Sequence, residues 1–177
     1  KKIGSATTDL YQSLVTIGTA MPEISTRATE AVAGTNLKHE VVVTQPATSA
    51  EESAGFQGVP IGRLLKSLVV RRGDDDFVFV LVPGDRQIDW KKLRGHLGVS
   101  RLSLPDRDEA KRATGYDPGT ITPFGSTKPW PVVLDESAAT PGVVTLGAGE
   151  RGVNIHVDAL DLKEYLNADI ADVTKPP

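Results

Sequence analysis

The spacing of apolar residues switches between a helical and an extended period along the chain. Near the start, Leu10, Leu14 and Ile17 recur at helical spacing, and the pattern resumes after Pro22. This predicts a helical lead-in, which we treat as an N-terminal extension over residues 1–36.

The strongest extended signal is a pair of apolar runs over residues 67–72 and 77–82, separated by a glycine and three aspartates. The spacing predicts a β-hairpin. Both faces of the second run are apolar, which is typical of a central strand. In an extended conformation Lys66 shares a face with Leu68 and Val70, so its amine is expected to lie along an apolar wall.

Capping residues and short β-rich runs predict the remaining elements. Helices are expected to begin near the capping residues Ser49, Asp89, Asp106 and Asp161. Strands are expected over residues 41–43, 132–134, 143–146 and 153–157. No repeat or linker interrupts this pattern. We therefore expect one α+β domain over residues 37–177, with a mixed sheet.

Composition narrows the class of protein. A chain of 177 residues fits one well-packed domain. The sequence holds no apolar run long enough to span a membrane, and its start lacks the apolar segment of a signal peptide, so we expect a cytoplasmic protein without a membrane partner. The absence of cysteine excludes disulfides, thiolate metal sites and a cysteine nucleophile.

The net charge of −3 argues against a protein that coats nucleic acid regardless of sequence, and we expect no DNA partner. The charges are unevenly distributed along the chain. Residues 61–112 carry 12 basic and 8 acidic side chains, whereas residues 113–177 carry 4 and 9. A solvated surface with local acidic partners such as Asp74, Asp75 and Asp76 is the favoured interpretation. The alternative is a modest patch near Lys66 that contacts phosphate.

Several kinds of chemistry are disfavoured by their sequence context. Residues 147–152 match the dinucleotide fingerprint G-x-G-x-x-G, but the β-rich residues 153–157 follow where a helix is required, so a hairpin turn is expected. The three histidines lack ligand spacing, and no serine has a nucleophile-elbow context. We therefore expect no metal and no cofactor.

Two features remain that suit a binding pocket. Lys66 is isolated in an apolar run, where its ammonium seeks an anion or a carbonyl. Residues 114–125 form a loop stiffened by two prolines and three glycines, which suits main-chain amides that meet a ligand. Each feature alone has a common structural explanation, namely a lysine that extends to the surface and a pair of turns. Together they indicate a pocket for a polar ligand that bears a carbonyl.

The order and spacing of these segments resemble the YbaK family of aminoacyl-tRNA deacylases, which are related to the editing insertion of bacterial prolyl-tRNA synthetases. The resemblance covers roughly residues 38–173. The segments that carry it are residues 66–70, 80–85, 114–116 with Gly119, 122–125 and 149–155. It implies a fold with a mixed, barrel-like sheet flanked by helices, in agreement with the elements above.

The resemblance also implies a function. It suggests a free-standing editing enzyme that hydrolyses a mischarged amino acid from tRNA, most typically cysteine from proline tRNA. Lys66 falls on the family's essential lysine, which engages the aminoacyl-adenosine end. In cysteine-specific members the substrate's own thiol is thought to attack its carbonyl, and in others a ribose hydroxyl is thought to activate water. The residues implied to bind substrate are Gly115, Tyr116, Gly119, Pro123, Phe124, Gly125, Gly149 and Asn154.

Asn154 departs from the aspartate typical of cysteine-specific members. A neutral amide forms hydrogen bonds but no ion pair with a substrate ammonium, so alanine or another small amino acid stays open as the substrate. The expected partners are the acceptor end of a mischarged tRNA and, by the resemblance, prolyl-tRNA synthetase. Two alternatives are a non-catalytic module that binds aminoacyl-tRNA or the synthetase, and a protein that binds a small nucleotide or amino acid.

Overall fold

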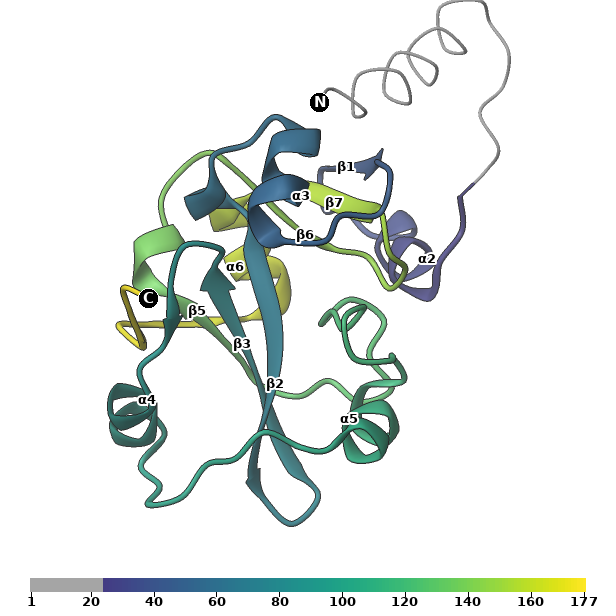
Figure 1. The fold of residues 1–177 in the computed structure, drawn as a ribbon. Helices are drawn as coiled ribbons and strands as arrows, with labels where there is room; N and C mark the ends of the chain where they lie inside the picture. Colours follow the sequence, from purple (N-terminus) through teal and green to yellow (C-terminus); the bar gives the residue numbers. More distant parts are fainter. Residues whose placement is uncertain (1–23) are drawn as a thin grey trace, which may run out of the picture.

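The structure is a computed structural model that describes residues 24–177. Within this range the strands form three sheets (Figure 1). The first has the order β1 (His39–Val43), β7 (Val153–Asp158), β6 (Val143–Gly147). The second has the order β2 (Leu65–Gly73), β3 (Asp76–Pro83), β5 (Val132–Asp135), β8 (Asp169–Ala171). The third pairs β4 (Gln87–Ile88) with β9 (Thr174–Lys175).

The α+β class predicted from the sequence is confirmed, but the strands do not form one barrel-like sheet. In the described residues, an isolated bridge between Leu64 and Thr145 links the three-stranded and four-stranded sheets. Beyond that bridge the edge of β2 borders a cavity instead of β6. The four-stranded sheet is mixed, because β2 and β3 are antiparallel while β3, β5 and β8 run parallel. The central position predicted for β3 is confirmed.

Three of the four helices that were predicted from capping residues begin at the predicted cap. The helices of the described residues are α2 (Arg27–Ala33), α3 (Ala50–Gln57), α4 (Trp90–Leu97), α5 (Arg107–Thr114) and α6 (Ala159–Leu166), with short 3₁₀ turns at Ile61–Arg63 and Glu136–Ala138. Ser49, Asp89 and Asp106 cap α3, α4 and α5 through side-chain oxygens that accept main-chain N–H groups. The prediction for α6 was three residues late, because Asp158 is its cap.

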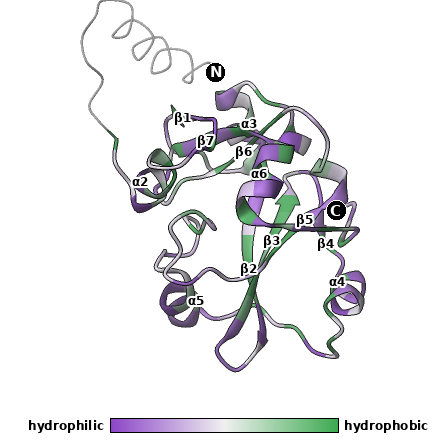
Figure 2. Ribbon diagram, turned by 180° about the vertical axis from the view of Figure 1, so that it is seen from behind, coloured by the Kyte–Doolittle hydropathy of each residue, from purple (hydrophilic) through white to green (hydrophobic). Residues whose placement is uncertain are grey.

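Two apolar clusters lie on opposite faces of the four-stranded sheet. The larger includes Phe79 and Leu81 of β3 and joins that sheet to the three-stranded sheet. The smaller includes Val80 and Val82 of the same strand and is covered by Leu93 of α4. The strands are accordingly apolar, whereas α5 and the tip of the β2–β3 hairpin are hydrophilic (Figure 2). The apolar character of both faces of β3 thus reflects burial on both sides.

The predicted N-terminal extension lies partly outside the described residues, because its first helical pattern falls within residues 1–23. Of the described part, Ala28 and Val32 of α2 are fully buried in the larger cluster. The Thr26 hydroxyl donates a hydrogen bond to the Ala148 carbonyl oxygen at 2.6 Å. The helix therefore packs directly on the turn between β6 and β7. Within residues 24–177, no helix has the length and apolar character needed to cross a membrane.

Candidate functional site

A cavity of about 560 Å³ lies beside the edge of β2. Its walls come from α3, the edge of β2, the loop over residues 118–121 and the hairpin of β6 and β7. This hairpin confirms that the G-x-G-x-x-G match is a turn between antiparallel strands, since β6 pairs with β7. The cavity has the size of pockets that hold small ligands.

The edge of β2 offers main-chain donors and acceptors to this cavity. Arg71 exchanges two main-chain hydrogen bonds with Ser103, at 2.7 and 3.1 Å, so its N–H and C=O point away from β3. Main-chain groups alternate in direction along an antiparallel strand, so those of Ser67 and Val69 also point away from β3. Both residues line the cavity. The buried Ser67 Oγ has no hydrogen-bond partner among the described residues.

Lys66 lines the same cavity and is half-buried. It lies between Ser67 and Leu65, and its side chain shares the sheet face of Leu68, as the sequence predicts. Its Nζ donates a hydrogen bond of 2.6 Å to the Arg86 carbonyl oxygen. The expectation that the ammonium seeks an anion or a carbonyl is therefore confirmed. An ammonium carries three donors, so this contact leaves two for a ligand.

The glycine/proline loop divides between the cavity and the core. Gly119 lines the cavity, and so does Gly149 of the neighbouring turn. By contrast, Gly115, Tyr116, Pro123, Phe124 and Gly125 are absent from its lining. Sequence reasoning placed all seven in one pocket, whereas the structure brings two of them to its wall.

The residues away from the wall build the support behind it. Tyr116 is buried, and its hydroxyl donates to the Phe124 carbonyl oxygen. Burial raises the pKa of Tyr116, so the phenol stays protonated and keeps this hydrogen bond at neutral pH. A Cβ on Gly149 would lie 2.7 Å from the Tyr116 ring. The ring therefore packs directly against the Gly149 backbone and supports the cavity wall.

Asn154 lines the cavity from β7 and is 8% exposed. Its Nδ2 donates a hydrogen bond of 3.3 Å to the Val42 carbonyl oxygen on β1. Val153 and Ile155, its neighbours along the strand, point into the larger apolar cluster. The alternation of β7 thus directs Asn154 toward the cavity, on the same side as His156.

A polar network at the cavity wall was not predicted from the sequence. The Gln57 Oε1 accepts hydrogen bonds from the Thr145 hydroxyl at 2.6 Å and from the His156 Nε2 at 2.9 Å. The Gln57 Nε2 donates to the Ser53 hydroxyl at 2.9 Å. The four residues come from α3, β6 and β7, which are far apart in the sequence. Their helical and extended periods gave no sign that they meet.

Stability is expected to depend on pH through His156. Burial lowers the pKa of His156 more than nearby Glu40 raises it. With its folded pKa below the unfolded value of about 6.5, His156 binds its proton more readily in the unfolded chain. Stability is therefore expected to be lost as pH falls from about 7 through the folded pKa. Thermal unfolding measured from pH 7.5 to 5 should show this loss, and His156→Gln should reduce it. Equal pH slopes in both proteins would contradict the prediction.

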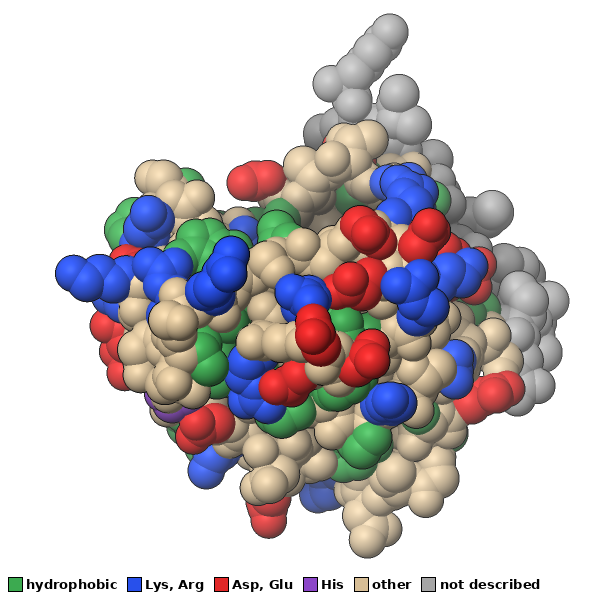
Figure 3. All heavy atoms as spheres, turned by 90° about the horizontal axis from the view of Figure 1, so that it is seen from below, with side chains coloured by type: hydrophobic (Ala, Val, Ile, Leu, Met, Phe, Trp, Pro, Cys, Tyr) green, Lys and Arg blue, Asp and Glu red, His purple; other side chains and the backbone are tan. Residues whose placement is uncertain are grey.

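Basic side chains of residues 61–112 are largely engaged by neighbours. Arg71 and Arg72 pair with Asp74 and Asp76 at the hairpin tip, at 2.6 and 2.9 Å. The Arg63 guanidinium donates to four carbonyl oxygens and to the Thr140 hydroxyl. Seen from below, acidic and basic side chains mix at the centre, while basic ones gather on the side of α4 (Figure 3). The favoured interpretation, a solvated surface with local acidic partners, is confirmed at the hairpin tip.

Comparison with known protein families identifies the domain that contains this cavity. Residues 44–165 match the aminoacyl-tRNA editing domain family. The chain belongs to that family. The match spans the cavity walls from α3 to β7 and includes Lys66, Gly119, Gly149 and Asn154.

Individual relatives agree with this membership. The chain is 28% identical over 137 residues to EbsC of Enterococcus faecalis, which is named as a proposed Cys-tRNA(Pro)/Cys-tRNA(Cys) deacylase, and the match covers 77% of this chain and 84% of EbsC. It is 32% identical over 122 residues to the proline–tRNA ligase of Trichlorobacter lovleyi, where the match covers 69% of this chain and 21% of the ligase. The chain thus corresponds to about a fifth of that synthetase.

Solved structures share the fold. A protein proposed to be a trans-editing enzyme for prolyl-tRNA synthetase superposes with a TM-score of 0.75 at 24% identity, over 86% of this chain and 99% of the other. A hypothetical protein superposes with a TM-score of 0.77 at 22% identity, over 85% of this chain and all of the other. The fold therefore occurs as a free-standing domain.

Proposed function

We propose that the protein is a trans-editing deacylase that hydrolyses a mischarged amino acid from tRNA, with cysteine on proline tRNA as its principal substrate. The observation that carries the proposal is Lys66 on the wall of a ligand-sized cavity within the matched editing domain. The deacylase name of EbsC, which the chain matches over most of both lengths, supports cysteine. We also propose that the protein acts in the cytoplasm alongside prolyl-tRNA synthetase, since the chain is similar to part of a proline–tRNA ligase.

The cavity supplies groups that bind and polarise an aminoacyl ester. The two spare N–H donors of Lys66 and the outward main-chain N–H groups of Ser67 and Val69 can donate to ester or ribose oxygens. Outward carbonyl groups of the same residues can accept from the substrate's ammonium. Such donors stabilise negative charge that develops on the carbonyl oxygen. In hydrolysis, water adds to the carbonyl carbon, the bond to the ribose oxygen breaks, and the amino acid and the ribose hydroxyl are released.

We propose that no side chain of the protein attacks the ester. The chain contains no cysteine. The half-buried His156 donates its Nε2 proton to Gln57, and no serine or threonine hydroxyl donates to it among the described residues. The reaction therefore relies on positioning the ester and on an oxygen or sulfur nucleophile that comes from water or from the substrate.

Release of amino acid from a panel of mischarged tRNAs tests the proposal. The panel comprises Cys-tRNA(Pro), Ala-tRNA(Pro), Ser-tRNA(Pro) and Cys-tRNA(Cys), each with a labelled amino acid. Fastest release from Cys-tRNA(Pro) is expected. Fastest release from Ala-tRNA(Pro) would keep the deacylase and replace its substrate. Binding without release from any member would instead support a non-catalytic aminoacyl-tRNA module.

Asn154 is proposed to influence the choice among these substrates. Asn154→Asp places a carboxylate at the cavity wall, where it can pair with the substrate ammonium, but it loses the hydrogen bond from Nδ2 to the Val42 carbonyl. One or two hydrogen bonds change a rate ratio by about two- to tenfold. We expect the kcat/KM ratios among cysteine, alanine and serine substrates to change by this factor. Unchanged ratios and rates would place Asn154 outside substrate contact, and Asn154→Ser serves as the neutral control.

A further inference from the structure

The ammonium of Lys66 is held by one specific turn. This turn follows β3 and is closed by a hydrogen bond from the Arg86 N–H to the Pro83 carbonyl oxygen, at 2.9 Å. The Gly84 N–H donates to the Leu64 carbonyl oxygen at 2.8 Å, which ties the turn to the start of β2. The Arg86 carbonyl oxygen then accepts from the Lys66 Nζ at 2.6 Å. The position of this carbonyl therefore determines where the ammonium lies.

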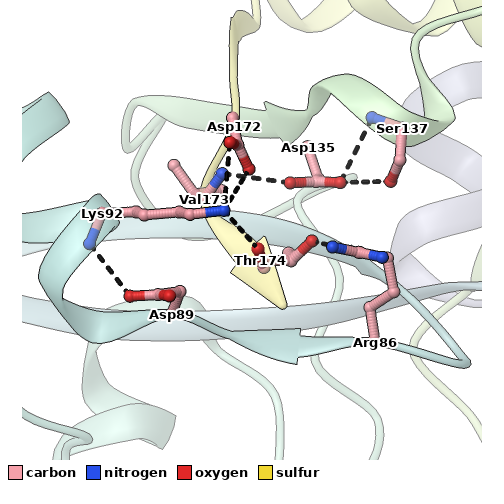
Figure 4. Close-up of polar contacts among 8 residues, drawn as sticks. All are labelled: Arg86, Asp89, Lys92, Asp135, Ser137, Asp172, Val173 and Thr174. Carbon is pink, nitrogen blue, oxygen red and sulfur yellow. Dashed lines mark hydrogen bonds and ion pairs between the residues drawn. The ribbon is translucent and has the colours of Figure 1, made fainter. Parts of the chain in front are cut away.

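The side chain of Arg86 is fixed by the C-terminal tail, nearly ninety residues later in the chain. The Arg86 Nε donates a hydrogen bond of 2.6 Å to the Thr174 hydroxyl (Figure 4). Thr174 is fully buried and lies in β9, opposite Ile88 of β4. The arginine thus joins the turn, through its own backbone, to a buried group on the last strand.

The tail itself is held at several points around Thr174 (Figure 4). The Lys92 Nζ donates to the Thr174 carbonyl oxygen at 3.1 Å and pairs with Asp172 at 2.9 Å. The Val173 N–H donates to the Asp135 Oδ1 at 3.1 Å. Asp135 is buried and lies at the end of β5, so the tail is attached to the central sheet.

We propose that Arg86 and Thr174 are positioning residues for Lys66. Contacts from the tail fix the Arg86 side chain, the Arg86 carbonyl takes one donor of the ammonium, and the other two donors are thereby aimed in a defined direction. This inference rests on the proposed function, because it assigns a task to the ammonium in substrate binding. Small displacements of a group that contacts the reacting atoms reduce rate strongly, whereas ground-state binding depends on the whole cavity.

Thr174→Val removes the hydroxyl and keeps the shape of the side chain. We expect kcat to fall about three- to tenfold, as for the loss of one hydrogen bond, with KM within about twofold of the wild-type value. Thr174→Ser should restore kcat, because it returns the hydroxyl. Arg86→Met should lower kcat at least as much. Leu97→Ala, which loosens the packing of α4 on the smaller cluster, is the control for a general loss of stability.

A second measurement follows Lys66 without substrate. In protein with ¹³Cε-labelled lysine, the Lys66 resonance is identified by its absence in Lys66→Met. In Thr174→Val and Arg86→Met we expect it to move toward the position of exposed lysines, and in Leu97→Ala to stay. An unmoved resonance, or a kcat that follows stability equally in all variants, would overturn the positioning role. Failure of the wild-type protein to release any amino acid would refute the proposed function, while this resonance still reports on the contact.

Discussion

Lys66→Met is expected to remove measurable deacylation while leaving the fold intact. The substitution keeps an unbranched side chain on the sheet face of Leu68 and removes the ammonium of a residue that lines the cavity. Loss of a single preorganised donor to a developing charge lowers kcat by about 10²–10³-fold. The stability cost is the hydrogen bond to the Arg86 carbonyl, worth about 1 kcal/mol. Single-turnover release from the preferred mischarged tRNA, together with thermal unfolding, measures both effects.

Two variants identify which property of the lysine matters. Lys91→Met removes an exposed lysine on α4 and the same unit of charge, so it should retain activity. Lys66→Arg keeps the charge but replaces a compact ammonium with a planar guanidinium, so activity should remain low. A Lys66→Met protein that unfolds several degrees earlier yet turns over normally would show that the lysine is structural.

The elements set by local chemistry could be predicted from the sequence. The extent of α4 follows from Asp89 as its cap and Gly98 as its left-handed end, and both signals lie within the helix's own sequence. The β2–β3 hairpin was equally clear, because two apolar runs flank a short polar turn. In such cases a few neighbouring residues satisfy the main-chain groups at the ends of an element.

The arrangement of the sheets could not be predicted in the same way. Strands β8 and β9 are three and two residues long, so they carry no periodicity of their own. They form because β5 and β4 present unpaired edges beside the C-terminal tail. The strands expected to form one barrel-like sheet are divided, because β2 and β6 belong to separate sheets that an isolated bridge between Leu64 and Thr145 links, and the strand residues alone do not indicate this division.

Some residues of the candidate site could be predicted from the sequence and others could not, for a physical reason. Lys66 was singled out because a charge in an apolar run is exceptional. Asn154 was singled out only through the family resemblance, as a departure from the aspartate of cysteine-specific members. The loop glycines have two uses that the sequence does not distinguish. Gly119 borders the cavity, whereas Gly125 allows the backbone of Arg27 to approach, since a Cβ there would lie 2.8 Å from its carbonyl oxygen. Gln57 and Thr174 act through partners distant in sequence and gave no local signal.

Gly152→Ala is expected to cause the largest loss of stability among the substitutions considered. Gly152 has a φ of +81°, in the left-handed region, and it precedes β7. A Cβ at this position would approach the Thr44 carbonyl oxygen more closely than real Cβ atoms do. The Thr44 N–H donates to the Gly152 carbonyl oxygen at 2.8 Å, so the two backbones cannot separate without losing that hydrogen bond.

The expected loss of stability has two causes, the left-handed backbone of the new alanine and the displaced Thr44 backbone. A second glycine, Gly98, separates them. A left-handed alanine costs about 1–2 kcal/mol by itself. Gly98 also has a positive φ, of +67°, but a Cβ there would meet nothing within 4 Å, so Gly98→Ala should show this cost alone. For Gly152→Ala the displaced backbone and its hydrogen bond raise the total to about 3 kcal/mol, or roughly 6–12 °C in Tm for a domain of this size. Equal Tm values for the two variants would mean that the backbone at Thr44 shifts without a measurable cost and does not hold β7 in place beside the cavity.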